Sequence, residues 1–238
     1  MRRWIFALLA VLCLSPALVR ADDSTAMPIR NAVAEANYRR MVEQFLAGEP
    51  SPLSTNNFRA FYANTRQYDP IGTDAIARLQ SLAAAVTESK GAADREQALA
   101  DYKDFLHQHL ANLDVVGAAL VLARQNPGLG DAAFLSKMYQ KLLDAVRFPG
   151  AGKTVLTAYQ VITVGEEKAV LDGLNADILQ TLRRHAGSIY YNIYDLRDRT
   201  TGMKYAIFVN ITIPIDYLQW LDDHKKAYRF RWPPAPPP

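Results

Sequence analysis

The spacing of apolar residues changes once along this chain, close to Gly152, and this change limits the possible folds more than any other feature. Before Gly152 the apolar residues recur every three to four positions, which is the period of amphipathic helices. After Gly152 the period falls to two, in segments rich in β-branched and aromatic residues, as in strands. The sequence therefore predicts an α+β protein in which a helical region precedes a small sheet.

The helical region contains six expected helices separated by glycine, proline and asparagine. They cover residues 38–46, 54–62, 73–90, 93–110, 115–125 and 131–148, with Ser54, Thr73 and Asp131 as N-caps. Successive pairs begin about 36 to 40 residues apart, a spacing compatible with tetratricopeptide-like helical hairpins. An irregular bundle explains the same spacing, so we expect a stack of about six antiparallel helices and leave their detailed packing open.

The second region is expected to form a β-α-β-β unit. Its strands cover residues 154–164, 188–196 and 204–213, and a helix over residues 166–186 joins the first strand to the second. A closing helix is expected over residues 215–228. Residues 233–238 form a proline-rich tail of the kind that stays solvated.

Residues 1–21 have the features of a secretory signal peptide. Arg2 and Arg3 precede an apolar run over residues 4–14, and Val19 and Ala21 form a small-residue cleavage site. The run is half the length of the roughly 20 residues that span a bilayer, so no transmembrane segment is expected after cleavage. We therefore expect an exported, periplasmic protein with a helical region over residues 22–150 and an α+β region over residues 151–232.

Cleavage after Ala21 would also change the charge of the chain. The full chain has 27 Lys and Arg against 24 Asp and Glu, and cleavage removes Arg2, Arg3 and Arg20 but no acid, which leaves 24 against 24. A neutral chain lacks the broad attraction to phosphate backbones or anionic lipid that nucleic-acid binding needs. The only cysteine, Cys13, lies in the removed segment, which excludes thiol catalysis and thiolate metal sites. Neither nucleic acid nor a cofactor is expected.

Three stretches of the mature chain resemble a known bacterial family. Residues 38–46 resemble its opening segment, residues 150–171 its central signature, and residues 205–211 its closing strand. The family is the one called domain of unknown function 4919. This chain departs from it at Ala151, where the family has aspartate, and at Lys168, where an aromatic residue is common. The resemblance implies an exported protein of this fold and adds no reaction.

His107 and His109 are the residues that first suggest a metal site. On a helix two positions separated by one residue point about 200° apart, so these two imidazoles cannot share an ion. A zinc site would also need further ligands at suitable spacing. We expect no metal.

Glu166 and Glu167 are the weak candidates for catalysis. They lie where a strand is expected to lead into a helix, and acidic side chains there are stabilised by the positive end of the helix dipole. That stability alone explains them. Either could act as a general base only if a polar partner in a cleft tuned its pKa.

Tyrosine and asparagine side chains of the expected sheet are the weak candidates for binding, because together they suit adaptable recognition. Cross-strand packing with one polar face is the simpler explanation of the same residues. The set consists of Tyr190, Tyr191, Asn192, Tyr194 and Asn210.

No group of residues forms a convergent catalytic set, so we expect a non-catalytic periplasmic binding or scaffold protein whose partner is another envelope protein. Two alternatives stay open. One is an envelope hydrolase that uses Glu166 or Glu167 as its base, and the other is an immunity or inhibitor protein for a toxin in the same compartment.

Overall fold

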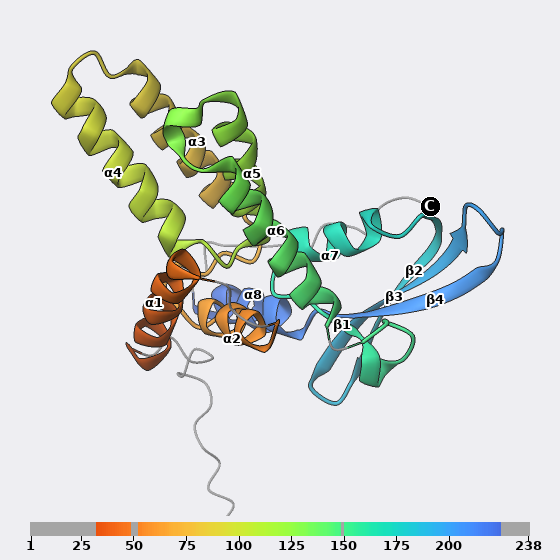
Figure 1. Ribbon diagram of the computed structural model, residues 1–238. Helices are drawn as coiled ribbons and strands as arrows, with labels where there is room; N and C mark the ends of the chain where they lie inside the picture. Colours follow the sequence, from red (N-terminus) through yellow and green to blue (C-terminus); the bar gives the residue numbers. More distant parts are fainter. Residues whose placement is uncertain (1–31, 49–51, 149, 225–238) are drawn as a thin grey trace, which may run out of the picture.

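The computed structural model describes residues 32–48, 52–148 and 150–224, and within them the chain is α+β. The expected signal peptide with Val19 and Ala21, and the proline-rich tail, lie outside the described residues. Six helices occupy the stretches where helices were expected (Figure 1). They are α1 (Ala32–Ala47), α2 (Pro52–Tyr62), α3 (Thr73–Glu88), α4 (Ala92–Gln108), α5 (Leu113–Gln125) and α6 (Ala132–Arg147).

The helix starts agree only in part with the expected caps. Asp131 caps α6 as expected, because its side chain accepts hydrogen bonds from the backbone amides of Ala133 and Phe134. Ser54 lies inside α2, and α3 is preceded by Gly72, whose positive φ of 78° favours glycine. The expected cap Thr73 was wrong because the Asp69 carboxylate accepts hydrogen bonds from the backbone amides of Gly72 and Ala75 at the start of α3. The expected cap Ser54 was wrong because α2 begins two residues earlier, at Pro52.

The six helices pack around one core but not only with their neighbours in sequence. Helices α1 and α2, α3 and α4, and α5 and α6 are in contact as pairs, while α3 also contacts α5 and α6 also contacts α2. Aromatic rings fill the centre: Tyr38 and Phe45 stack on Phe58 with ring centroids 4.9 and 4.5 Å apart. The α2–α6 contact joins the first and third pairs directly, and a stack in chain order does not contain such a contact.

The sheet contains four strands in the order β1-β4-β3-β2. Strand β1 (Tyr159–Gln160) is parallel to β4 (Lys204–Asn210), and β3 (Ile189–Asp198) is antiparallel to both β4 and β2 (Ala176–Ala186). Helix α7 (Val164–Asp172) separates β1 from β2, and α8 (Thr212–His224) follows β4. The unit is therefore β-α-β-β-β.

Two expectations about this region were wrong. Residues 176–186 form a strand where the helix over 166–186 was expected to continue, and residues 155–157 form a single helical turn where a strand was expected. Ile178 and Leu182 are four residues apart, as on a helix face, but a bulge at Leu179 breaks the alternation of β2. Pairing of β2 along the whole of β3 determines the structure of this segment, and no local pattern encodes that pairing.

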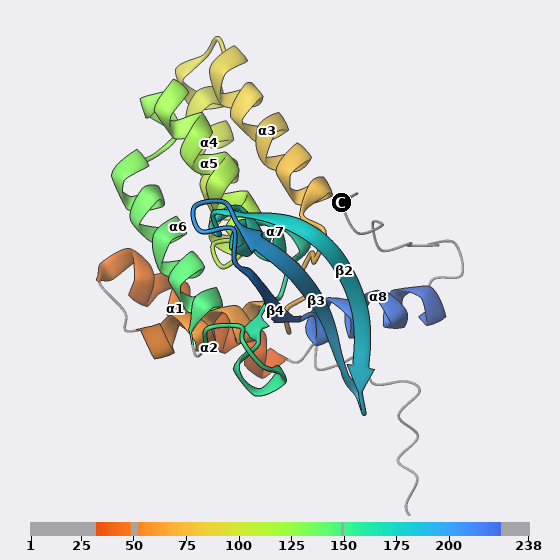
Figure 2. The same ribbon diagram turned by 90° about the vertical axis from the view of Figure 1, so that its right-hand side faces the viewer.

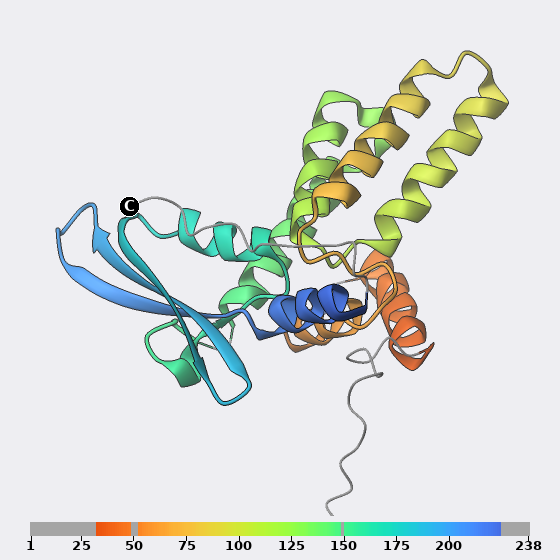
Figure 3. The same ribbon diagram turned by 180° about the vertical axis from the view of Figure 1, so that it is seen from behind.

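One face of the sheet packs on α6 and α7, and α8 crosses the back of the molecule (Figures 2 and 3). The core on that face contains Val146 of α6, Val170 of α7, and Leu196, Ile207 and Val209 of the sheet. Tyr217 of α8 contacts Tyr68 in the segment that joins α2 to α3, with ring centroids 4.9 Å apart. In the described part of the chain, no helix is both long enough and apolar enough to cross a membrane.

Candidate functional site

The N-terminus of α7 gathers three carboxyl groups, which we call the α7 acid cluster: Glu166, Glu167 and Asp114. Helix α7 begins where it does because the side chain of Thr163 accepts a hydrogen bond from the backbone amide of Glu166, 3.1 Å away. Asp114 comes from the first turn of α5. Acidic groups at this end of a helix are stabilised by its dipole, which agrees with the position expected for the two glutamates.

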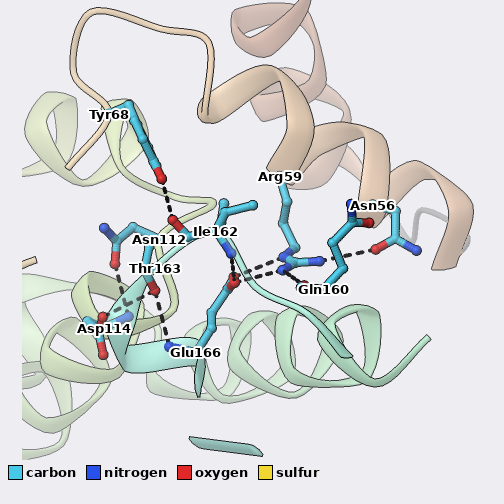
Figure 4. Close-up of polar contacts among 9 residues, drawn as sticks. All are labelled: Asn56, Arg59, Tyr68, Asn112, Asp114, Gln160, Ile162, Thr163 and Glu166. Atoms are coloured by element: carbon cyan, nitrogen blue, oxygen red, sulfur yellow. Dashed lines mark hydrogen bonds and ion pairs between the residues drawn. The ribbon is translucent and has the colours of Figure 1, made fainter. Parts of the chain in front are cut away.

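Glu166 is fully buried and forms an ion pair with Arg59 of α2 (Figure 4). Arg59 Nε donates to one carboxylate oxygen at 2.9 Å and Nη2 donates to the other at 2.7 Å. The backbone amide of Ile162 donates to the second oxygen at 2.6 Å. Arg59 also donates to the carbonyl of Gln160 and to Asn56. The charge of the Glu166 carboxylate is thus neutralised by Arg59, and both of its oxygens accept hydrogen bonds inside the protein.

Glu167 faces the sheet instead. Its Oε1 accepts hydrogen bonds from Asn192 Nδ2 at 2.6 Å and from the Tyr194 hydroxyl at 2.8 Å, both on β3. Arg183 of β2 donates to Asn192 Oδ1 at 3.0 Å. Burial raises the pKa of Glu167, while its two hydrogen bonds and the charge of Arg183 oppose that rise. Burial likewise raises the pKa of Tyr194.

Asp114 joins α5 to the same helix start. Burial, and then the negative charge of Glu166, raises its pKa from 3.8 to about 6, although hydrogen bonds from Thr163 and the Gly165 amide oppose the rise. A β carbon on Gly165 would overlap the Asp114 carboxyl group. Glycine at this position is therefore what allows α5 and α7 to approach so closely.

The α7 acid cluster connects the helical region to the sheet. Glu166 binds Arg59 of α2, Glu167 binds side chains of β3, and Asp114 of α5 accepts a hydrogen bond from Thr163 at the start of α7. The Tyr68 hydroxyl donates to the carbonyl of Ile162 beside Glu166 (Figure 4). A general base must come within hydrogen-bond reach of a substrate proton. Glu166 is 0 % exposed and Glu167 is 5 % exposed, and protein groups already occupy both oxygens of Glu166 and Oε1 of Glu167.

A cavity of about 390 Å³, which we call the α8 cavity, is lined by α8, α3, α4 and the segment that joins α2 to α3. Its apolar wall is formed by Phe105 of α4 and by Tyr217, Leu218 and Leu221 of α8. Its polar groups come from three other places in the fold, the α2–α3 segment, α3 and the end of α4. They are Asp69, Asp74, Arg78 and His109.

His109 connects the α8 cavity to a buried polar network. Its Nδ1 lies 3.0 Å from the Tyr62 hydroxyl, which also accepts from Asn112 Nδ2 at 3.3 Å. Burial lowers the pKa of His109 from 6.5 to about 4, so the imidazole is neutral at pH 7. His107 lines a different cavity, between α1 and α4. The two histidines therefore line different cavities, and His109 is the residue that follows the last turn of α4.

The structure divides the expected tyrosine and asparagine set between the two faces of the sheet. Asn192 and Tyr194 contact Glu167, so two sets of candidate residues meet in one network. Tyr191 pairs with Asn210 across the strands, on the opposite face. Tyr190 is within hydrogen-bond distance of Gln219 in α8. The five residues do not form one binding surface.

Several residues of these networks were not found from the sequence, Arg59, Asp69, Asn112 and Asp114 among them. Arg59 lies 107 residues from Glu166, and nothing local marks the pair. One signal was present: Thr163 followed three residues later by Glu166 has the form of a helix-starting motif. It would have placed the start of α7 correctly.

No family model matches the chain, and no curated protein or solved structure matches it either. The resemblance to the domain of unknown function 4919 family stays a prediction. The geometry of the chain itself is therefore the basis for its proposed function.

Proposed function

We propose that this is an exported, non-catalytic binding protein that holds a segment of another envelope protein in the α8 cavity. The observation that carries the proposal is the contrast between two sites. Glu166 and Glu167 of the α7 acid cluster are buried and hydrogen-bonded to protein groups, whereas the α8 cavity combines an apolar, aromatic wall with polar groups. Binding sites commonly have that second composition.

The chemistry of the cavity indicates the kind of segment that would bind. Phe105 and Tyr217 offer aromatic faces, and Asp69 and Asp74 supply negative charge beside them. A partner segment with an aromatic or aliphatic side chain next to Lys or Arg satisfies both features. The volume of about 390 Å³ suits one or two side chains rather than a folded surface.

The helical pairs α1–α2, α3–α4 and α5–α6 would serve as the rigid framework for this site, in the manner of the helical hairpins expected from the sequence. Each pair is in contact, and α3 and α4 both contribute to the cavity. Enclosure of Glu166 and Glu167 counts against the alternative of a hydrolase that uses either one as its base.

Photo-crosslinking in cells tests the proposal. A photoreactive amino acid in place of Arg78, which lines the cavity, should capture a defined partner protein. The same amino acid in place of Glu88, at the exposed far end of α3, is the matched control. The same products from both positions, or none from position 78, would overturn the proposal.

A further inference from the structure

Strand β2 forms one edge of the sheet, and among the described residues no strand pairs with its outer side (Figure 2). Its extensive contacts are with β3 alone. In an antiparallel pair, every second residue of an edge strand directs its backbone N–H and C=O groups outward, where another chain can pair with them. The outer side of β2 is therefore a template for one more strand.

The second half of β2 is regular enough to accept such a strand. Proteins commonly close a sheet edge with a short strand, a proline, a bulge or a covering helix. Strand β2 is 11 residues long and contains no proline, and its one shift in register lies between Ile178 and Gln180. From Gln180 to Ala186 the pairing with β3 continues without another shift. We call residues 180–186 the β2 edge.

The β2 edge is basic and exposed. It carries Arg183, Arg184 and His185, and residues 178–194 contain no acidic residue. The whole run 183–189, which includes the turn into β3, is exposed. Basic side chains on an edge disfavour pairing with a basic or neutral strand and favour an acidic one.

The two arginines of the β2 edge differ in what their charges contact. Arg183 donates to Asn192, and its charge opposes the rise in the pKa of Glu167. Arg184 donates to the backbone carbonyl of Arg183 at 3.3 Å and forms no ion pair with a residue that the structure describes. The charge of Arg184 is therefore the one that a partner could neutralise.

An apolar row crosses the sheet beside Arg184, on the face away from α7. Leu182 of β2 pairs with Ile193 of β3, which pairs with Phe208 of β4, and all three side chains are half-buried. Arg184 lies two residues from Leu182 and so on the same face. A strand added at the β2 edge would extend this row, with side chains two positions apart beside Leu182 and Arg184.

We propose that the β2 edge binds an extended segment of a partner protein, which adds a strand to the sheet and places an apolar side chain beside Leu182 and an acidic one beside Arg184. In this mode of recognition the backbone hydrogen bonds supply affinity and alternate side chains supply specificity. A second copy of the chain fits less well, because two paired β2 edges would bring four arginines into one sheet. The surface is separate from the α8 cavity, so this inference does not rest on the proposed function.

Peptide binding tests the charge and the apolar contact. The probe is a labelled synthetic peptide with threonine at every second position and valine and glutamate alternating between them. Fluorescence anisotropy should show saturable binding, and Arg184→Glu should weaken it about fivefold or more, because repulsion replaces attraction. Arg124→Glu makes the same change in the exposed last turn of α5 and should leave the affinity unchanged.

Two methylated forms of the same peptide test the backbone pairing. Only one of the two alternating sets of amides in an added strand faces β2. Methylation of the threonine amides, or of the valine and glutamate amides, should therefore abolish binding in one case and preserve it in the other. On binding of the unmethylated peptide, hydrogen exchange should slow at alternate amides of residues 180–186.

Three results would overturn strand addition at the β2 edge. They are the absence of saturable binding, equal binding of the two methylated peptides, and equal affinity in Arg184→Glu and Arg124→Glu. Analytical ultracentrifugation tests the choice of partner. A protein that dimerises, and becomes monomeric in a Leu182→Glu variant, would show that a second copy occupies the edge and that the proposed acidic segment is wrong.

Discussion

Arg59 and Glu166 form an ion pair in which both side chains are almost completely buried. A buried ion pair recovers the cost of desolvation only while both partners are present. Arg59→Met should lower the free energy of unfolding by about 3–5 kcal/mol, because it leaves the Glu166 carboxylate buried without a countercharge.

The double variant Arg59→Met with Glu166→Met separates that penalty from simple loss of contact. It removes both charges, so it should be more stable than Arg59→Met alone when both are unfolded in urea. Exchange of the exposed, paired residues Lys168 and Asp172 for Met provides the control, and it should cost at most about 1 kcal/mol. A double variant no more stable than the single one would contradict the assigned role of the pair.

Asp114 and His109 give stability opposite dependences on pH. The pKa of Asp114 is raised from 3.8 to about 6, so the folded chain binds this proton more tightly and stability falls as pH rises from about 4 to 6. The pKa of His109 is lowered from 6.5 to about 4, so the unfolded chain takes that proton first and stability falls as pH drops through the same range. The two effects largely cancel in the wild type.

Single variants should reveal each effect. Relative to wild type, the unfolding free energy of Asp114→Asn should rise between pH 4 and 6, by up to about 3 kcal/mol. For His109→Gln the unfolding free energy relative to wild type should instead increase as pH falls from 6.5 to 4, because the variant lacks the group whose protonation destabilises the wild type. Denaturant titrations at several pH values measure both, with the exposed Asp74→Asn as control. Parallel pH profiles for the three variants would contradict these two assignments.

At the level of elements, the start of α7 depends on one residue without a side chain. Replacing glycine by alanine inside a helix ordinarily stabilises it by about 1 kcal/mol. Gly165→Ala should instead destabilise the protein by about 2 kcal/mol or more, because its β carbon would overlap the Asp114 carboxyl group and overpack the site. Thermal or urea unfolding measures the change.

Removal of the carboxyl group gives the matched test. In an Asp114→Ala background the obstruction is gone, so Gly165→Ala should be neutral or stabilising there. An equal effect of Gly165→Ala in both backgrounds would show that contact with Asp114 is not the reason for glycine.

The elements also show what the sequence alone could and could not predict. Helices α3 to α6 were foreseen closely because their apolar spacing and the Asp131 cap are local signals. Strand β2 was missed because Leu174, Ile178 and Leu182 are spaced four residues apart, as on a helix face, and because its pairing with β3 is not a local property.

The candidate site was foreseen in part for the same reason. Glu167, Asn192 and Tyr194 were each named, yet nothing near them in sequence indicated that they touch. The partner of Glu166 lies 107 residues away on α2, and a single sequence does not encode which arginine reaches it. Residue types were thus predictable where local chemistry selects them, and contacts were not.

At the level of the whole molecule, the proposed export makes a prediction about charge. Cleavage after Ala21 removes three arginines and leaves 24 basic against 24 acidic residues. The protein purified from the periplasm should therefore begin at Asp22 and focus near neutral pH, whereas the full chain has a pI near 8.9. N-terminal sequencing and isoelectric focusing check both points. A periplasmic protein that retains Met1, or its absence from that compartment, would contradict the export proposal.

The ion pair between α2 and α7 also affects when the helical region can fold during synthesis of the chain. Arg59 leaves the ribosome 107 residues before Glu166, so α2 has no anion to neutralise its guanidinium until most of the chain exists. Burying the unpaired cation earlier would be costly. We therefore expect the face of α2 that carries Arg59 to stay hydrated while the rest of the chain is made, and the helical region to close only once α7 is present.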